Sequence, residues 1–254
     1  MPSDKTLPML LRSFKLPAFA REHAVVAEQA GREGLTHEGY LLALSKIEAH
    51  ERSERRVQRL LFDSHLPLEK SLATFDLTRL PPKARTSFNA LKDGAFLDRS
   101  ENVLAFGLPG SGKTHLLCAL GHELVRGGRK VLFAPAFQIV QKLLVAKRDL
   151  KLVSELKRLD RFDALLIDDI GYVQQSREEM EVLFTLLAER YERRSVLITS
   201  NLIFSKWDQI FKDTMTTAAA IDRVVHHSVI LELNIESFRA HEAKERLRKA
   251  KEAA

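Results

Sequence analysis

The chain has 254 residues, of which 45% are hydrophobic, so it can form one large domain or two smaller ones. Its formal net charge is +6, and residues 76–150 carry 12 basic and 6 acidic residues, which is compatible with a polyanionic partner. The single cysteine, Cys118, excludes an intramolecular disulfide framework, and no apolar run reaches the length of about 18 residues that a membrane span needs. We therefore expect a cytoplasmic protein without a membrane partner.

The first 70 residues are predicted to form a small, all-helical domain. Apolar residues recur at helical spacing in three stretches, near residues 7–16, 19–30 and 40–59, and glycines at 31 and 34 end the second stretch. Residues 63–75 are predicted to be a linker, because a proline interrupts the helical pattern there. The third stretch places four arginines on one face, which is either solvated or contacts a partner. They are Arg52, Arg55, Arg56 and Arg59.

A phosphate-binding loop is predicted at residues 107–114, between an apolar strand at 103–106 and an amphipathic helix. Its glycines allow backbone N–H groups to surround an anion, and the helix N-terminus adds a partial positive charge. Lys113 is expected to reach the β- and γ-phosphates, and the Thr114 hydroxyl is expected to bind Mg²⁺. The predicted nucleotide contacts are Gly107, Leu108, Pro109, Gly110, Ser111, Gly112, Lys113, Thr114 and His115.

Two acidic residues follow the predicted strand at 164–167, and they form the second motif. Parallel strands present their carboxyl ends at the same edge of a sheet, so these acids are expected beside the phosphate-binding loop. Asp168 is predicted to hold Mg²⁺, and Asp169 to orient or deprotonate an attacking water. Asn201 follows the predicted strand at 196–199, and either positions this water or is an ordinary turn asparagine.

Five apolar runs in all predict a five-stranded parallel α/β sheet flanked by helices, with the other two strands at 131–134 and 229–231. After the second strand, residues 138–161 are rich in basic side chains. This stretch is either a solvated helical surface or a track for DNA phosphates. The candidate DNA contacts are Lys142, Lys147 and Arg148.

The order of these motifs resembles that of the AAA+ ATPases, and more closely the branch that contains IstB-type transposition helpers and DnaC-type helicase loaders. The Ile-Asp-Asp-Ile-Gly sequence at 167–171 is similar to that branch, and Ala-Ile-Asp-Arg-Val-Val-His-His at 220–227 is more like IstB. The resemblance implies that Asn201 is the sensor-1 residue, and that Arg223 is an arginine finger acting on ATP in a neighbouring subunit. It also assigns Walker A to residues 107–114, and Walker B to Asp168 and Asp169.

We expect a helical domain at 1–70, an ATPase domain at 71–236 and a charged helical tail at 237–254, without a C-terminal lid domain. The function implied by the resemblance is an ATP- and Mg²⁺-dependent ATPase that assembles on duplex DNA as a ring or spiral homo-oligomer. Such an oligomer would assist a cognate transposase in target selection. The alternatives are a DnaC-like replicative helicase loader on single-stranded DNA, a nucleotide-gated scaffold with almost no hydrolysis, and a small-molecule kinase.

Without a lid domain, a second arginine that senses the nucleotide is not expected, and ATP hydrolysis by the protein alone is predicted to be slow. DNA or the protein partner is expected to stimulate it. Steady-state turnover measured with and without duplex DNA tests this expectation, and fast turnover by the protein alone would contradict it.

Overall fold

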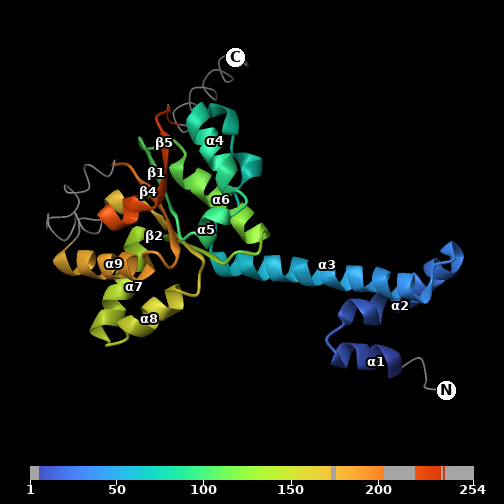
Figure 1. The fold of residues 1–254 in the computed structure, drawn as a ribbon. Coiled ribbons are helices and arrows are strands. Elements are labelled where there is room, and N and C mark those ends of the chain that lie inside the picture. Colours follow the sequence, from blue (N-terminus) through green and yellow to red (C-terminus); the bar gives the residue numbers. More distant parts are fainter. Residues whose placement is uncertain (1–5, 173–175, 203–220, 236, 238–254) are drawn as a thin grey trace, which may run out of the picture. The chain divides into compact units, whose positions relative to one another are not determined.

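The computed structural model describes residues 6–172, 176–202, 221–235 and 237 (Figure 1). The chain divides into two compact units, residues 1–59 and 60–254. The sequence-based division at residue 70 stays a prediction. The helices are α1 (Thr6–Ser13), α2 (Pro17–Glu33), α3 (His37–Ser64), α4 (Pro82–Leu91), α5 (Ala95–Asp98), α6 (Lys113–Arg126), α7 (Ala136–Arg148), α8 (Leu152–Leu159) and α9 (Arg177–Arg190).

The first unit contains α1, α2 and most of α3, as the helical pattern predicts. Helix α2 continues through Gly31 to Glu33 and is capped by Gly34, because of the two glycines only Gly34 takes the left-handed conformation, with φ of 66°. At the other end of α2, the buried Glu48 carboxylate of α3 accepts a hydrogen bond of 2.9 Å from the Ala18 N–H. Burial alone would raise the pKa of Glu48, but its bonds to Arg52 and Ala18 hold that pKa below the ordinary value.

The arginine face of α3 is partly engaged within the first unit. Arg52 donates to Glu48, and Arg55 lies within ion-pair distance of Glu48 and Glu51. These two side chains therefore have intramolecular partners, as expected of a solvated helical face with interspersed acids.

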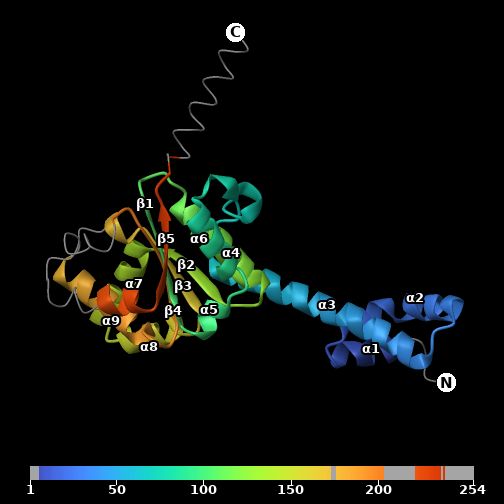
Figure 2. The ribbon, with the colours of Figure 1, turned by 45° about the horizontal axis from the view of Figure 1, so that its top comes forward.

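The second unit is built on a parallel sheet with the strand order β2-β3-β4-β1-β5, which confirms the predicted fold class (Figure 2). Leu104 of β1, the strand between β4 and β5, pairs with Ile198 of β4 on one side and with Ile230 of β5 on the other. The strands are β1 (Asn102–Gly107), β2 (Val131–Pro135), β3 (Ala164–Asp168), β4 (Ser195–Ser200) and β5 (Ser228–Leu233).

Both faces of the sheet are covered, so successive residues of a strand enter different cores. Val103 and Ala105 of β1 pack in the core that also contains α4 and α6, whereas Leu104 and Phe106 pack in the core with α7 and α9. This explains the continuous apolar runs in the sequence, since a strand that is buried on both faces has no polar alternation.

Residues 65–75 are packed rather than free, so their prediction as a linker was wrong. Leu66 and Phe75 are both buried in the core on the α6 side of the sheet. Gly121 of α6 permits the close approach of Leu66, because a Cβ there would lie 3.0 Å from the leucine side chain. The ring of His122, also on α6, hydrogen-bonds the Pro67 carbonyl at 3.0 Å. The proline ended the helix as expected, but the apolar residues around it hold the segment against the sheet domain.

The proline at residue 82 favours the start of a helix, and the sequence predicts one over residues 82–96. This stretch is interrupted, because Gly94 takes a left-handed conformation with φ of 76°. It therefore forms α4 and the short α5. The sequence also predicts helices at 204–211 and 215–225. The first of these and the tail at 237–254 lie outside the described residues, apart from residue 237. Of the helix predicted at 215–225, residues 221–225 are described and are helical. No helix in the described part of the chain has the length and apolar character that crossing a membrane requires.

Arg190, at the end of α9, is a buried cation that joins several chain segments. Its guanidinium donates to the carbonyls of Leu159, Phe162 and Ser195 at 3.1, 3.0 and 2.9 Å, and to that of Asp163 at 3.4 Å. Burial lowers its pKa to about 10, which leaves it charged at neutral pH. The side chain thereby fixes the loop before β3 and the start of β4.

Replacement of this guanidinium is expected to be strongly destabilising. Arg190→Met is predicted to lower the free energy of unfolding by about 3 kcal/mol, because several buried carbonyl groups lose their donor. The matched control is Arg193→Met, which removes an exposed side chain paired with Asp160 and Glu189 and should cost less than about 1 kcal/mol. Urea unfolding followed by circular dichroism measures both, and equal losses for the two variants would contradict the prediction.

Candidate nucleotide-binding site

The phosphate-binding loop connects the carboxyl end of β1 to the first turn of α6. Gly107 must be small, because a Cβ there would lie 2.5 Å from the carbonyl oxygen of Leu233. Gly112 precedes α6 in a left-handed conformation with φ of 88°, which glycine adopts without strain. The loop therefore presents backbone N–H groups and a helix N-terminus to one point, an arrangement that binds phosphate.

Lys113 is the first residue of α6 and is 7% exposed. Its ammonium group donates to the carbonyls of Gly107 and Leu108, each at 2.9 Å. The lysine is thus held against the loop itself, where it lines the same pocket as the acids described below.

A chain of hydrogen bonds joins the loop helix to β3 and β4. Asp168 Oδ1 accepts hydrogen bonds from the hydroxyls of Thr114 and Thr199, both at 2.7 Å. The Thr199 hydroxyl in turn accepts from the N–H of Asp169 at 2.7 Å. The arrangement fixes the carboxylate beside the Thr114 hydroxyl. No sequence pattern indicates a role for Thr199, because a threonine inside an apolar run is typical of any strand.

Asp169 and Asn201 are also brought together, as predicted from the ends of their strands. The Asn201 amide donates to Asp169 Oδ1 at 3.3 Å. Burial raises the pKa of Asp169 above its ordinary value, and the adjacent charge of Asp168 raises it further. A carboxylate with a raised pKa has more affinity for a proton, which suits a group that takes one from water.

These side chains line an open pocket with a volume of about 510 Å³. One part of its wall was not anticipated from the sequence, because it comes from the segment that was predicted to be a linker. That part is formed by Lys70, Thr74 and Phe75. Pro109, Gly110, Gly112, Lys113, Thr114, His115, Asp168, Asp169, Thr199 and Asn201 complete the lining.

His115 connects the loop helix to this part of the wall. Its Nε2 lies 3.2 Å from the Ser71 carbonyl and 3.1 Å from the Thr74 hydroxyl, and its ring packs edge-on against Phe75 at 5.0 Å. Burial lowers the pKa of His115 below its ordinary value, which favours the neutral ring. Of the other predicted contacts, Ser111 is buried, whereas Leu108 is 67% exposed.

Arg223 is not part of this constellation. It is exposed in the helical residues 221–226, immediately before β5. The register pairs Asn102 with Ser228 at the amino ends of β1 and β5, and the phosphate-binding loop follows the carboxyl end of β1. The six residues of β1 separate the two sites by about 17–20 Å at the usual rise per residue. Arg223 therefore lies near the edge of the sheet opposite to the pocket of its own chain.

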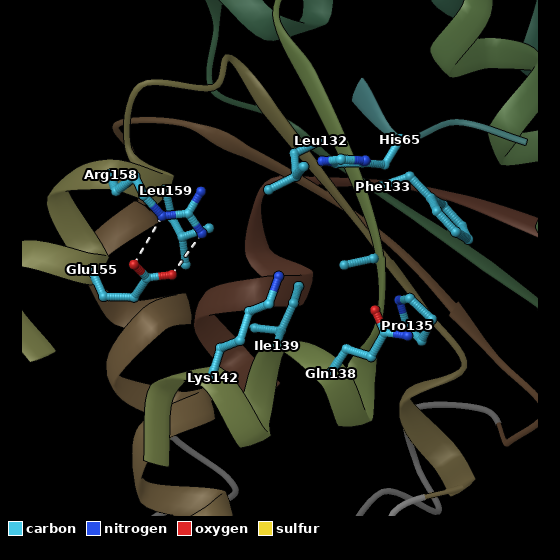
Figure 3. Close-up of a pocket in the computed structure, with 11 residues that line it drawn as sticks. His65, Leu132, Phe133, Pro135, Gln138, Ile139, Lys142, Glu155, Arg158 and Leu159 are labelled. Atoms are coloured by element: carbon cyan, nitrogen blue, oxygen red, sulfur yellow. Dashed lines mark hydrogen bonds and ion pairs between the residues drawn. The ribbon is translucent and has the colours of Figure 1, made fainter. Parts of the chain in front are cut away.

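The three candidate DNA contacts lie on α7 and point in different directions, since they are five and six residues apart in a helix of 3.6 residues per turn. Lys147 forms an ion pair with Glu181 at 2.8 Å, and Arg148 lies 3.4 Å from Asp149. Lys142 points into a second pocket of about 390 Å³ beside β2, opposite the Glu155–Arg158 ion pair of α8 (Figure 3). This second pocket contains none of the predicted nucleotide ligands.

Known proteins with similar sequences cover nearly the whole chain. The sequence model of the IstB-like ATP binding protein family matches residues 9–246. A protein of Sinorhizobium fredii, named as an insertion sequence ATP-binding protein, is 42% identical over 95% of this chain and 82% of its own length. A protein of Pseudomonas aeruginosa, named as an ATP-binding protein of insertion sequence IS21, is 36% identical over 93% of this chain and 89% of its own length.

Solved structures with a similar fold include replication proteins. AMPPCP-bound DnaA from Aquifex aeolicus has a TM-score of 0.57 and 20% identity, over 73% of this chain and 57% of the DnaA chain. The DnaC helicase loader has a TM-score of 0.54 and 17% identity, over 66% of this chain and 98% of that chain. At these identities the likeness concerns the fold, and it agrees with the predicted class.

The Thr199 hydroxyl is predicted to be needed for hydrolysis. Thr199→Val keeps the shape of the side chain but removes both hydrogen bonds to the acidic pair, so kcat for ATP should fall about 10- to 100-fold. The matched control is Thr185→Val on α9, whose hydroxyl donates only to the Glu181 carbonyl of its own helix. ATPase assays on both variants make the comparison, and unchanged turnover in Thr199→Val would refute this role.

Proposed function

This chain belongs to the family of IstB-like ATP-binding proteins, and we propose that it hydrolyses ATP within a DNA-bound homo-oligomer that assists a transposase in target selection. The observation that carries the proposal is the position of Arg223. It is exposed at the sheet edge opposite to the pocket of its own chain, so it is available to the pocket of a neighbouring subunit. We further propose that the oligomer acts in the cytoplasm.

The pocket contains oxygen ligands for Mg²⁺ and hydrogen-bond donors for the phosphates of ATP. Mg²⁺ prefers oxygen ligands and usually keeps several waters, so one hydroxyl and one carboxylate together with phosphate oxygens suffice. Thr114 and Asp168 supply these two oxygens, already held side by side at 2.7 Å. When bound, the ion neutralises charge on the phosphates. The N–H groups of the loop and the ammonium group of Lys113 would bind the phosphate oxygens.

The remaining polar groups would act on the attacking water. Asp169 would accept its proton, and Asn201, which bonds to Asp169, would orient both groups. Arg223 of the adjacent subunit would stabilise charge on the transferred phosphoryl group, an effect of roughly 10³- to 10⁵-fold in analogous enzymes. Hydrolysis would then depend on assembly, since the pocket of each subunit would receive its arginine only from a neighbouring subunit.

DNA binding is proposed from charge and from the names of the relatives. The basic excess of the chain lies in residues 76–150, and contacts with the phosphate backbone require no sequence readout. Lys142, Lys147 and Arg148 remain the candidate contacts, although Lys147 would first have to leave Glu181. The relatives are named for insertion sequences, which supports a role beside a transposase.

Sizing in solution tests the proposal with a duplex of about 50 base pairs, roughly 170 Å of charged backbone. The wild type is expected to form large complexes only when both ATP and duplex are present. Arg223→Ala should form the same complexes but lose hydrolysis by about 10³-fold or more.

Two results would contradict this function. A protein that stays monomeric on duplex with ATP would not be an assembling ATPase. A protein that assembles only on single-stranded DNA or on a helicase would instead be a DnaC-like helicase loader.

A further inference from the structure

We propose that Asn102 positions Arg223, which acts in the pocket of the neighbouring subunit. Strand β1 thereby links the phosphate-binding loop of a subunit to the arginine that the same subunit supplies to its neighbour. The inference rests on the proposed function, because it requires that Arg223 acts between subunits. Asn102 would be a positioning residue, since it touches neither nucleotide nor the reacting atoms.

Asn102 is the first residue of β1 and is 7% exposed. Both the oxygen and the nitrogen of its side-chain amide form hydrogen bonds. Oδ1 accepts a hydrogen bond of 2.9 Å from the Val196 N–H of β4, and Nδ2 donates one of 3.0 Å to the Val224 carbonyl. Its backbone N–H also donates to the His227 carbonyl at 2.7 Å. One buried residue therefore joins β1, β4 and the helical residues that carry Arg223.

The Val224 carbonyl is the point at which Asn102 can control the arginine. Val224 is 3% exposed and packs in the core beside α7 and α9, whereas the preceding Arg223 is exposed. The described helical stretch, residues 221–226, ends two residues after Val224, shortly before β5 begins at Ser228. The bond from Asn102 restrains its rotation, and with it the direction in which Arg223 leaves the surface.

The same strand reaches the other site. Gly107, the last residue of β1, begins the phosphate-binding loop, and β1 pairs on both sides with parallel strands. A strand that is buried on both faces moves as one body, since its packed neighbours resist local distortion. A shift of the loop on binding or loss of the γ-phosphate would therefore reach Asn102 and the helix of Arg223. The nucleotide bound at one subunit interface can in this way affect the position of the arginine at the next interface.

Asn102→Asp separates the two functions of the amide. The carboxylate can still accept from the Val196 N–H, but it has no donor for the Val224 carbonyl. DNA-stimulated kcat is expected to fall at least tenfold, with little change in KM for ATP, because the pocket of each subunit keeps all of its own ligands. Asn102→Ala removes both bonds without burying a charge, and it replaces the first variant if that variant does not fold.

Mixed oligomers test where the defect lies. The donor is Asp169→Asn, which cannot hydrolyse ATP but keeps the phosphate-binding loop and Arg223. Mixed with an equal amount of this donor, Asn102→Asp should recover about a quarter of the wild-type rate, because random mixing in a head-to-tail ring places the donor arginine beside an intact pocket at about a quarter of the interfaces. Arg223→Ala mixed with the same donor is the positive control.

The controls separate this inference from the proposed function. If Arg223→Ala is not rescued by the donor, Arg223 does not act between subunits and the proposed function fails. If Arg223→Ala is rescued but the Asn102 variant is not, Asn102 acts on its own pocket and the inference is wrong. His122→Ala, which loses one buried hydrogen bond to Pro67, should keep its kcat. Equal loss of kcat in this variant would indicate a general effect of stability and would overturn the positioning role.

Discussion

The Asp168 carboxylate, which accepts hydrogen bonds from Thr114 and Thr199, is the interaction on which the site depends. It joins the loop helix, β3 and β4 through one oxygen atom. The two hydroxyl donors restrict the rotation of the carboxylate, so the group is in place before a ligand arrives. Only the parallel arrangement of the strands makes this possible, because it brings the carboxyl ends of β1, β3 and β4 to the same edge.

The sequence predicted those features that depend on local pattern. Five apolar runs predicted the five strands, and strand ends followed by Lys113, Asp168 or Asn201 predicted where polar groups would meet. These predictions succeeded because a strand that is buried on both faces admits few polar residues until it ends. The role of Thr199 could not be predicted in this way, since its partners lie 30 and 31 residues earlier in the chain. The interruption at Gly94 was missed because a glycine inside a helical pattern is often tolerated.

The carboxyl ends and the amino ends of the strands differ in chemistry. Asn102 lies at the amino ends, where contacts are hardest to predict from sequence patterns. Motifs at the carboxyl edge combine glycines, acids and a lysine, which are rare in apolar runs and easy to recognise. At the amino edge, by contrast, the side chain of Asn102 bonds to the backbone at residues 196 and 224. Backbone carbonyls and N–H groups are the same in every residue, so no local pattern marks these contacts. For the same reason, the four backbone carbonyls that bond to Arg190 could not be predicted from the sequence.

The packing of residues 65–75 determines where the chain can be divided. A fragment that starts at residue 71 would lack Leu66, which fills the space beside Gly121, and would lack Lys70 from the pocket wall. It would also leave the ring of His122 without the Pro67 carbonyl. Such a fragment would retain every nucleotide motif and yet have an incomplete core and an incomplete pocket. Leu60 also packs in that core, so an ATPase fragment intended for study by itself should include the last turn of α3.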